Sequence, residues 1–399
     1  MKTLTTALAL TLSLFLSVNL HAQVTIGSTE TPASGAILDL KQAGTTTKGL
    51  GLPRVKLVKR VDSDISTTIN GVAAGAYPGD HTGLLVYNVA DESNPYCAAI
   101  PSGLYVWNGS EWQPIGSDPF GPVETYTDQD GNAFYARQFG NAGTWMTQNL
   151  AAKHYAKPDG TADTDNPIPF TQSYYSGDEL VDPLIAYPNA NENGSIPYGS
   201  VDFSVIPSTW RLEQGILYNW QAATKSRKGS DGTTPVGSEG QGQADESDSE
   251  GIQGICPKGW HLPNDREWNV LEKELTENAS LYSESTANSV WNTIWENATW
   301  ALRGTHGAVM KSQCPLPNST YPAGGNSLSL SKGGFNTLLV GQVDVSYTQE
   351  YGEVAYIWTA SNNSPINAWF RILPYNKDSV EKSDVYYHRS LMSVRCKKN

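Results

Sequence analysis

The four cysteines, Cys97, Cys256, Cys314 and Cys396, have the most readily defined chemistry in this sequence. No two of them are close enough for a CxxC redox motif or a zinc motif. An even number of cysteines allows two disulfides and three pairings, and disulfides persist in an oxidising compartment. The cysteines therefore predict cross-links, although buried free thiols remain an alternative.

A second group of candidate ligands lies in the segment VETYTDQDGNAFYARQ, where Asp128, Asp130 and Asn132 alternate as at the start of an EF-hand calcium loop. The later ligands and the bidentate glutamate of an EF-hand are missing, so we expect an ordinary turn around Asp130-Gly131. The chain has six histidines and no HExxH motif. The sequence therefore predicts neither a metal site nor a cofactor.

The segment from Gly341 to Tyr356 mixes aromatic rings with carboxylates at Asp344, Tyr347, Tyr351 and Glu353. Aromatic rings can stack on sugars or peptides, and loops on a rigid scaffold commonly carry recognition. We expect these four residues to bind a ligand, with ordinary exposed side chains as the alternative. No Ser-His-Asp group or paired-carboxylate motif is identifiable, and we predict no catalytic residue.

Charge and composition limit the partners. The chain has 399 residues, 39% hydrophobic and 10% aromatic, with a net charge of −13 at pH 7. Such a chain has room for two domains and a sizeable core. Its negative charge opposes binding to nucleic acid or anionic membranes. We expect a glycan or protein ligand at the cell exterior.

The first residues predict export. Lys2 precedes a mostly apolar stretch from Leu4 to Leu20, and Ala22 offers a small residue for cleavage. A membrane anchor is the alternative, but Thr and Ser residues interrupt the apolar run and no stop-transfer charges follow it. We expect residues 1–22 to be a signal peptide and the mature protein to be extracellular or on the cell surface, not integral to the membrane.

Three features organise the rest of the chain. Residues 23–120 contain short apolar runs bounded by Gly, Pro, Asn and Asp, which predict a β-rich domain with a type I′ hairpin at Asn108-Gly109. The segment SDPFGPVE predicts the boundary to a second domain, residues 123–399. Residues 153–205 read as irregular loop, and the polar residues 226–251 as a flexible insertion.

The second domain predicts an α+β fold. A helix should begin after Asn264, with Glu267 completing a capping box and Trp268, Leu271 and Leu275 on one buried stripe. A second helix is expected over 289–302, with its tryptophans in the core. The runs GGFNTLLVGQ, AYIWTAS, AWFRILP and SLMSVRCKK predict strands of an antiparallel sheet.

Six blocks in this order resemble one known family. They are GTWMTQNLA, GILYNWQAA, GICPKGWHLPNDREWNVLEKEL, GGFNTLLVG, YIWTAS and MSVRCKK. Together they resemble the Fibrobacter succinogenes major paralogous domain, found in secreted proteins of Bacteroidetes and Fibrobacteres. The resemblance covers about 123–399 and implies a C-type-lectin-like fold, with two helices, a small antiparallel sheet and long loops.

The resemblance also implies a disulfide between Cys256, before the first helix, and Cys396, in the last strand. Closing so long a loop would stabilise the domain by nominally about 4–5 kcal/mol. Cys97 and Cys314 could bridge the two domains or remain apart. The N-terminal segment is similar to Bacteroidetes surface proteins and, more loosely, to trimeric phage tail-fibre necks, which allows a homo-oligomer.

Three classes of function follow. A non-catalytic binding or adhesion protein is favoured, although the Glu-Pro-Asn or Gln-Pro-Asp and Trp-Asn-Asp triplets of calcium-dependent lectins are absent. A structural subunit of a surface appendage or matrix is the alternative. An enzyme related to formylglycine-generating enzymes is a further alternative, but that chemistry needs reactive cysteines, and Cys256 and Cys396 are expected to be bonded.

Overall fold

The computed structural model describes part of the chain. The described residues are 24–26, 31, 38–40, 50–60, 62–89, 100–116, 123–171, 182–190, 201–225, 238–239, 251–285, 287–297, 302–344, 347–362, 367–385 and 388–399. The chain divides into two compact units, Met1–Pro53 and Arg54–Asn399. The predicted signal peptide lies outside the described residues. No described helix has the length and apolar character needed to cross a membrane.

The described helices are short except for one. The α-helices are α2 (Trp220–Thr224), α3 (Asp265–Glu277), α4 (Ala279–Tyr282), α5 (Ile294–Asn297) and α6 (His306–Met310). The 3-10 helices are η1 (Ile65–Thr68), η3 (Gly140–Ala142), η4 (Leu212–Gln214) and η5 (Leu330–Lys332).

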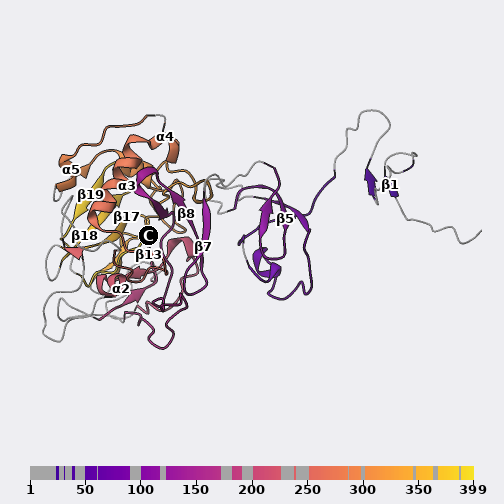
Figure 1. The fold of residues 1–399 in the computed structure, drawn as a ribbon, viewed down its shortest axis with the longest axis horizontal. Helices are drawn as coiled ribbons and strands as arrows, with labels where there is room; N and C mark the ends of the chain where they lie inside the picture. The colour runs from indigo at the N-terminus through magenta and orange to yellow at the C-terminus, as the bar shows by residue number, and fades with distance from the viewer. Residues whose placement is uncertain are drawn as a thin grey trace, which may run out of the picture. The chain divides into compact units, whose positions relative to one another are not determined.

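Strands account for most of the regular structure and are arranged in several small sheets (Figure 1). They are β1 (Val24–Ile26), β2 (Leu38–Leu40), β3 (Arg54–Val55), β4 (Leu85–Asn88), β5 (Gly103–Trp107), β6 (Trp112–Pro114), β7 (Glu124–Thr127), β8 (Ala133–Gln138), β9 (Thr144–Met146), β10 (Ile185–Ala186), β11 (Leu217–Tyr218), β12 (Ser238–Glu239), β13 (Trp260–His261), β14 (Leu302–Arg303), β15 (Gln342–Asp344), β16 (Tyr347–Gln349), β17 (Val354–Asn362), β18 (Ala368–Pro374), β19 (Val380–Ser383) and β20 (Lys397–Lys398). Mixed helices and strands make the fold α+β.

In the first unit, β1 and β2 pair in parallel. The second unit begins with a four-stranded sheet in the order β3-β4-β5-β6. We refer to the described residues of 54–116 as the β-module and to those of 123–399 as the C-terminal domain. The domain boundary predicted at SDPFGPVE stays a prediction.

The β-module contains the predicted hairpin but not the predicted turn. Trp107 pairs with Trp112, so four residues connect β5 and β6 instead of two. The Asn108 side-chain oxygen accepts hydrogen bonds from the backbone N–H groups of Ser110 and Glu111, at 3.0 and 2.8 Å. Asn108 thus closes the loop through its side chain, and Gly109 alone takes a positive φ, of 106°. Local side-chain bonding has replaced the type I′ turn.

Two five-stranded sheets form the frame of the C-terminal domain. Their orders are β13-β20-β9-β8-β7 and β12-β17-β18-β19-β14. Side chains of β17 alternate between two apolar clusters, because successive residues of a strand face opposite sides. Ala355 and Ile357 pack with α3, whereas Tyr356 and Trp358 belong to the larger cluster on the other face.

Helix α3 forms as its sequence predicts. The Asn264 side chain accepts from the backbone N–H of Glu267, and the Glu267 carboxylate accepts from the backbone N–H of Asn264. This capping box satisfies two N–H groups at the helix start. Trp268, Leu271 and Leu275 are fully buried. The helix covers one face of β17 and β18 (Figure 1).

The second predicted helix, 289–302, is wrong. Only Ile294–Asn297 is helical, and Leu302 lies in β14. Two residues of the expected apolar stripe face solvent, Val290 at 84% and Ile294 at 73% exposure. A helix of this length is held mainly by tertiary packing, which these residues do not provide. The prediction that its tryptophans are core residues holds for Trp291, which is buried.

The remaining loop and strand predictions have mixed outcomes. The runs AYIWTAS and AWFRILP lie in β17 and β18. The run GGFNTLLVGQ is mostly irregular, and of SLMSVRCKK only β20 is a strand. The described part of 153–205 is irregular apart from β10. The predicted insertion at 226–251 lies mostly outside the described residues.

Candidate functional site

A buried disulfide joins the start of α3 to the end of the chain. Cys256 and Cys396 are bonded, with 5.9 Å between their Cα atoms and 140 residues between them in sequence. Both are fully buried in the larger apolar cluster. The pairing that the family resemblance implied is therefore present. Cys314 is also disulfide-bonded, and Cys97 lies outside the described residues.

A charged cluster beside this disulfide reinforces the same junction. The Glu267 carboxylate accepts from Lys397 Nζ at 2.7 Å and lies 2.9 Å from His261 Nε2. His261 Nδ1 lies 2.7 Å from the Asn399 side-chain oxygen. Burial alone would raise the pKa of Glu267, but His261 and Lys397 outweigh it and lower this pKa to about 2. Burial and the charge of Lys397 lower the pKa of His261, but the hydrogen bonds to Glu267 and Asn399 and the charge of Glu267 outweigh them, so this pKa is raised overall.

The far side of α3 carries a fully buried ionic network. Glu272 pairs with Arg303 at 2.6 Å, with Arg371 at 2.5 Å and with His306 at 2.9 Å. Burial alone would raise the pKa of Glu272, but the charges of Arg303 and Arg371 hold it well below its usual range. Burial also lowers the pKa of His306.

The network continues to the first residue of the helix. Asp265 pairs with Arg371 at 2.8 Å and with Lys382 at 2.6 Å. The side chains of these residues have no exposed surface. Burial lowers the pKa of Lys382 to about 8. Because water and solutes do not reach these groups, the network fixes α3 against β18 and β19 and offers no group to a ligand.

The four predicted ligand residues make different contacts in the structure, and their role in binding a ligand stays a prediction. Asp344, in β15, accepts a hydrogen bond from the Ser390 hydroxyl at 3.1 Å. The Tyr351 hydroxyl accepts from Gln214 Nε2 at 3.1 Å, and its ring packs against an apolar cluster. Tyr347 lies in β16, and its side chain is outside the described residues. Asp344 and Tyr351 are thus partly committed to contacts within the fold.

Glu353 has neighbours that sequence reasoning missed. Tyr321 and Tyr375 lie with ring centroids 4.8 Å apart at an interplanar angle of 44°. The charge of Glu353 raises the pKa of Tyr321. The Tyr375 backbone N–H donates to the Glu353 carbonyl at 2.8 Å. All three side chains are partly exposed. We call Tyr321, Glu353 and Tyr375 the tyrosine face.

A buried lysine holds the backbone below this face. Lys311 Nζ donates to the carbonyls of Pro374, Tyr375 and Lys377 at 2.7, 3.3 and 2.6 Å. Burial lowers the pKa of Lys311 to about 8. The ammonium group thereby fixes the turn after β18 and the position of Tyr375. No local pattern predicts this arrangement, because Tyr321 and Tyr375 lie in separate irregular segments.

In the turn from Asp128 to Asn132, the acidic side chain of Asp128 binds the backbone of the turn itself. Asp128 Oδ1 accepts from the N–H groups of Asp130 and Asn132, each at 2.9 Å. Burial raises the pKa of Asp128 to about 6. Asp130 lies 2.5 Å from His154 Nδ1. The predicted turn is present, and the described residues contain no group of three or more metal-capable His, Cys, Asp or Glu side chains.

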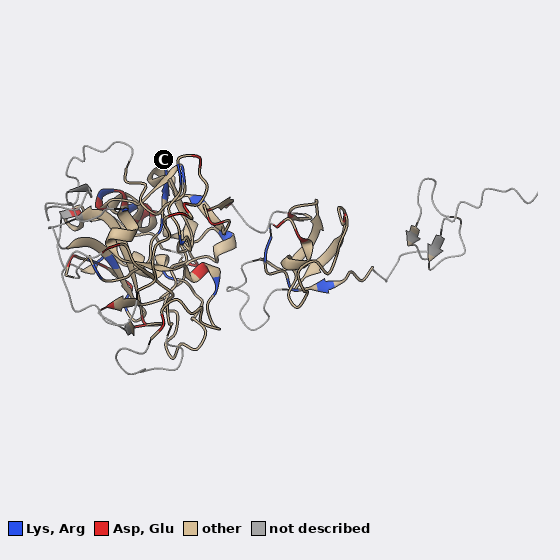
Figure 2. Cartoon of the chain, turned by 90° about the horizontal axis from the view of Figure 1, so that it is seen from below, with Lys and Arg blue, Asp and Glu red and all other residues tan. Residues whose placement is uncertain are grey.

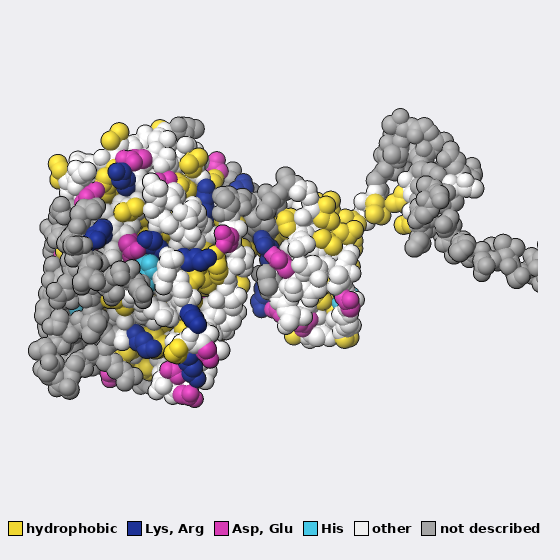
Figure 3. Space-filling view, in the orientation of Figure 1, with side chains coloured by type: hydrophobic (Ala, Val, Ile, Leu, Met, Phe, Trp, Pro, Cys, Tyr) yellow, Lys and Arg dark blue, Asp and Glu magenta, His cyan; other side chains and the backbone are white. Residues whose placement is uncertain are grey.

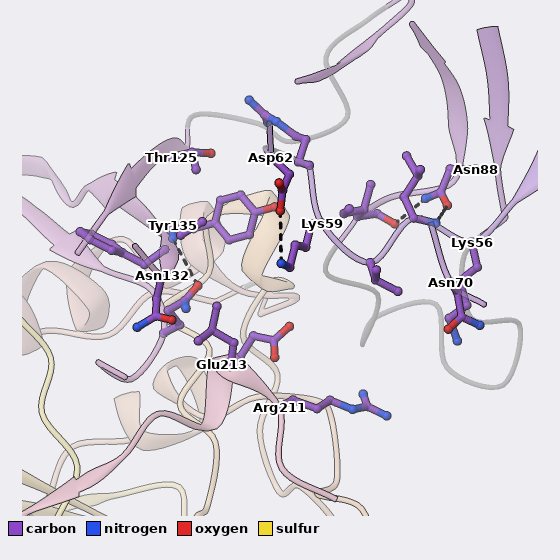
Figure 4. Close-up of a pocket in the computed structure, with 18 of the residues that line it drawn as sticks. Lys56, Lys59, Asp62, Asn70, Asn88, Thr125, Asn132, Tyr135, Arg211 and Glu213 are labelled. Carbon is purple, nitrogen blue, oxygen red and sulfur yellow. Dashed lines mark hydrogen bonds and ion pairs between the residues drawn. The ribbon is translucent and has the colours of Figure 1, made fainter. Parts of the chain in front are cut away.

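A cavity of about 520 Å³ is lined by both the β-module and the C-terminal domain (Figure 4). Lys59 and Asp62, which line it, form an ion pair at 3.3 Å. Burial raises the pKa of Tyr135, another lining residue, to about 12. Arg211 and Glu213 add charges of both signs. Positive and negative residues are likewise interspersed over the C-terminal domain (Figure 2). The cavity therefore concentrates no single charge for a ligand.

Comparison with known proteins identifies two regions. A family model for the Fibrobacter succinogenes major domain matches residues 140–398. A second model, for a phage tail like trimerisation region, matches residues 25–132. No curated protein and no solved structure matches the chain.

Proposed function

This chain belongs to the Fibrobacter succinogenes major domain family, and we propose that it is an exported, non-catalytic binding or adhesion protein. In this proposal residues 1–22 direct export, and the C-terminal domain is a C-type-lectin-like scaffold that presents a ligand-binding surface. The ligand is a glycan or a protein at the cell exterior. The N-terminal region assembles the chain into a homo-oligomer.

The tyrosine face carries this proposal. Tyr321 and Tyr375 present two partly exposed aromatic rings beside the carboxylate of Glu353. Aromatic side chains supply large contact areas at low entropic cost, and a neighbouring carboxylate adds hydrogen-bond acceptors. The face rests on a backbone held by Lys311. A rigid support of this kind lowers the entropic cost of binding.

The scaffold assignment is supported by the order of its parts. Cys256 precedes α3, and the cysteine bonded to it, Cys396, lies immediately before the last strand. The resemblance to the C-type-lectin-like fold implies this order. The non-catalytic assignment is supported by the same pair, because formylglycine-generating chemistry needs reactive cysteines and these two are bonded to each other and buried.

The binding proposal can be tested on arrays of glycans and extracellular-matrix proteins. We expect the mature chain to bind a member of these arrays equally well with and without chelator. The double variant Tyr321→Ala/Tyr375→Ala should lose at least tenfold in affinity, consistent with one or two lost contacts of about 1.4 kcal/mol or more. Tyr351→Phe is the matched control, because Tyr351 packs within the fold. Unchanged affinity in the double variant would exclude the tyrosine face.

A second candidate function is a structural subunit of a surface appendage or matrix. The match of residues 25–132 to a phage tail like trimerisation region favours it. Binding and assembly are compatible within one chain. Failure of the arrays together with a stable oligomer would favour the structural role.

A further inference from the structure

The two middle strands of the β-module sheet, β4 and β5, expose apolar side chains on one face, and the exposed Arg54 of β3 and Gln113 of β6 are paired beside them. Along β4 and β5, alternate side chains point to opposite sides of the sheet. The inward set forms the module core, where Val86, Tyr105 and Trp107 are buried. The outward set contains Leu85, Tyr87, Leu104 and Val106, joined by Ile115 after β6; we call these five residues the apolar face.

Strand register places these side chains next to one another. Tyr87 is paired with Leu104, and Leu85 with Val106. The Ile115 backbone N–H donates to the Leu104 carbonyl at 2.8 Å, which continues the first row. Leu85, Tyr87, Leu104 and Ile115 are 39%, 38%, 39% and 47% exposed. Figure 3 shows hydrophobic side chains gathered on the body that contains β5.

This arrangement departs from the usual antiparallel sheet. A sheet that packs one face on a core normally presents polar residues on the other. Neither β4 (LVYN) nor β5 (GLYVW) contains a charged residue. A contiguous apolar surface of this kind marks an interaction site.

We propose that the apolar face is the surface through which three copies of this chain associate. The inference rests on the homo-oligomer in the proposed function and names the residues that form it. The partner is a further copy because the face lies within the region, residues 25–132, that matches a trimerisation model. The five side chains of the apolar face carry no charge, so copies of it meet without electrostatic repulsion among these residues, and within the described strands of this sheet the single charge beside them is that of Arg54 at the β3 edge.

The test is the mass of the full mature chain, residues 23–399, in sedimentation velocity over a range of concentrations. We expect the unaltered chain to sediment as a trimer. Tyr87→Ser/Leu104→Ser should raise the concentration at which the trimer dissociates by roughly 100-fold, because two apolar contacts are lost in each copy. Tyr77→Ser is the matched control, since Tyr77 is 44% exposed in the same module but lies off the apolar face. It should remain trimeric.

A second measurement needs no variant and covers the case in which the double variant does not fold. Nitration of the unaltered chain should modify Tyr77 readily and Tyr87 slowly, and dilution below the dissociation concentration should remove this difference. Equal nitration of both tyrosines in a trimer would overturn the proposed face.

The other outcomes separate the two proposals. A trimer that survives in a folded Tyr87→Ser/Leu104→Ser variant would overturn the face and leave the oligomeric role standing. A dimer would overturn the association of three copies. A monomer at the highest attainable concentration would overturn both this inference and the oligomeric part of the proposed function, while the array experiment would still decide ligand binding.

Discussion

The β-module and the C-terminal domain place their polar and apolar side chains in opposite ways. The β-module exposes Leu85, Tyr87 and Leu104 on its sheet, whereas the C-terminal domain buries Glu272 and Arg371 completely. Buried ion pairs need good geometry to offset desolvation, and exposed apolar groups need a partner to be removed from water. The C-terminal domain therefore pairs these buried charges internally, whereas the β-module presents the apolar face, which we propose binds further copies of the chain.

In the C-terminal domain, we expect the largest effect on stability from removal of the disulfide. Cys256→Ala/Cys396→Ala should lower the free energy of unfolding of the C-terminal domain by about 4–5 kcal/mol, because a loop closed over 140 residues loses its constraint. Urea unfolding followed by tryptophan fluorescence measures this change. Cys314→Ala removes a cysteine that belongs to a different disulfide and serves as the comparison. A loss under about 1 kcal/mol in the double variant would contradict the expectation.

The second largest loss of stability is expected from a change in the buried ionic network around Glu272. Glu272→Gln should destabilise the domain by about 4 kcal/mol, because Arg303 and Arg371 would keep their charges without this carboxylate. Glu277→Gln, on the same helix at a partly exposed position, should change stability by about 0.5 kcal/mol or less. If urea unfolding showed the same loss of unfolding free energy for both substitutions, the buried charge of Glu272 would contribute no more to the stability of this domain than the partly exposed charge of Glu277.

Two tyrosines on paired strands test the two faces of the β-module directly. Tyr105→Ala should lower the free energy of unfolding of the β-module by about 3 kcal/mol, because Tyr105 is fully buried in the module core. Tyr87→Ala should cost about 0.5 kcal/mol or less under conditions where the chain is monomeric. Thermal unfolding by circular dichroism at low protein concentration measures both. A larger loss at Tyr87 would mean that its ring stabilises the monomer itself.

Acid should remove the contribution of Glu267. Because its pKa in the folded chain is about 2, below the usual 4.5, its charged form stabilises the domain above about pH 4.5, and this contribution is lost as the pH falls toward 2. The His261 contribution is complete below pH 6.5 and is lost as the pH rises through its raised pKa. The free energies of unfolding of the wild type and of Glu267→Gln should differ most between about pH 4.5 and pH 6.5, by on the order of 2 kcal/mol. A difference in urea stability that is independent of pH would contradict this assignment.

The parts that could be predicted from the sequence are local. Asn264 and Glu267 are three residues apart, so the start of α3 depends on contacts that the sequence displays directly. The Cys256–Cys396 disulfide came from the family resemblance and not from spacing. The four-residue loop at Asn108 was not predicted, because its side-chain hydrogen bonds compete with the turn favoured by Asn-Gly.

The parts that could not be predicted depend on distant contacts. Glu272 meets Arg371 across 99 residues of sequence, and neither residue looks buried from its type. Tyr321 and Tyr375 come together from separate segments of the chain, and Lys311 binds the backbone of the turn after β18 that carries Tyr375. Among the predicted ligand residues whose side chains the structure describes, Glu353 is the one that belongs to this face, and a loop sequence gives no direct sign of where its side chains point.

The long disulfide loop has a mechanical consequence. Tyr321, Glu353 and Tyr375 all lie between Cys256 and Cys396 in the sequence. If the chain is held by its N-terminal region and a ligand pulls on the tyrosine face, tension reaches the bridge and then divides between two covalent arms, one on each side of the attachment point. Each arm carries part of the force, and neither can lengthen without the other. A tether of this design would resist extension at the surface where we expect the load to be applied.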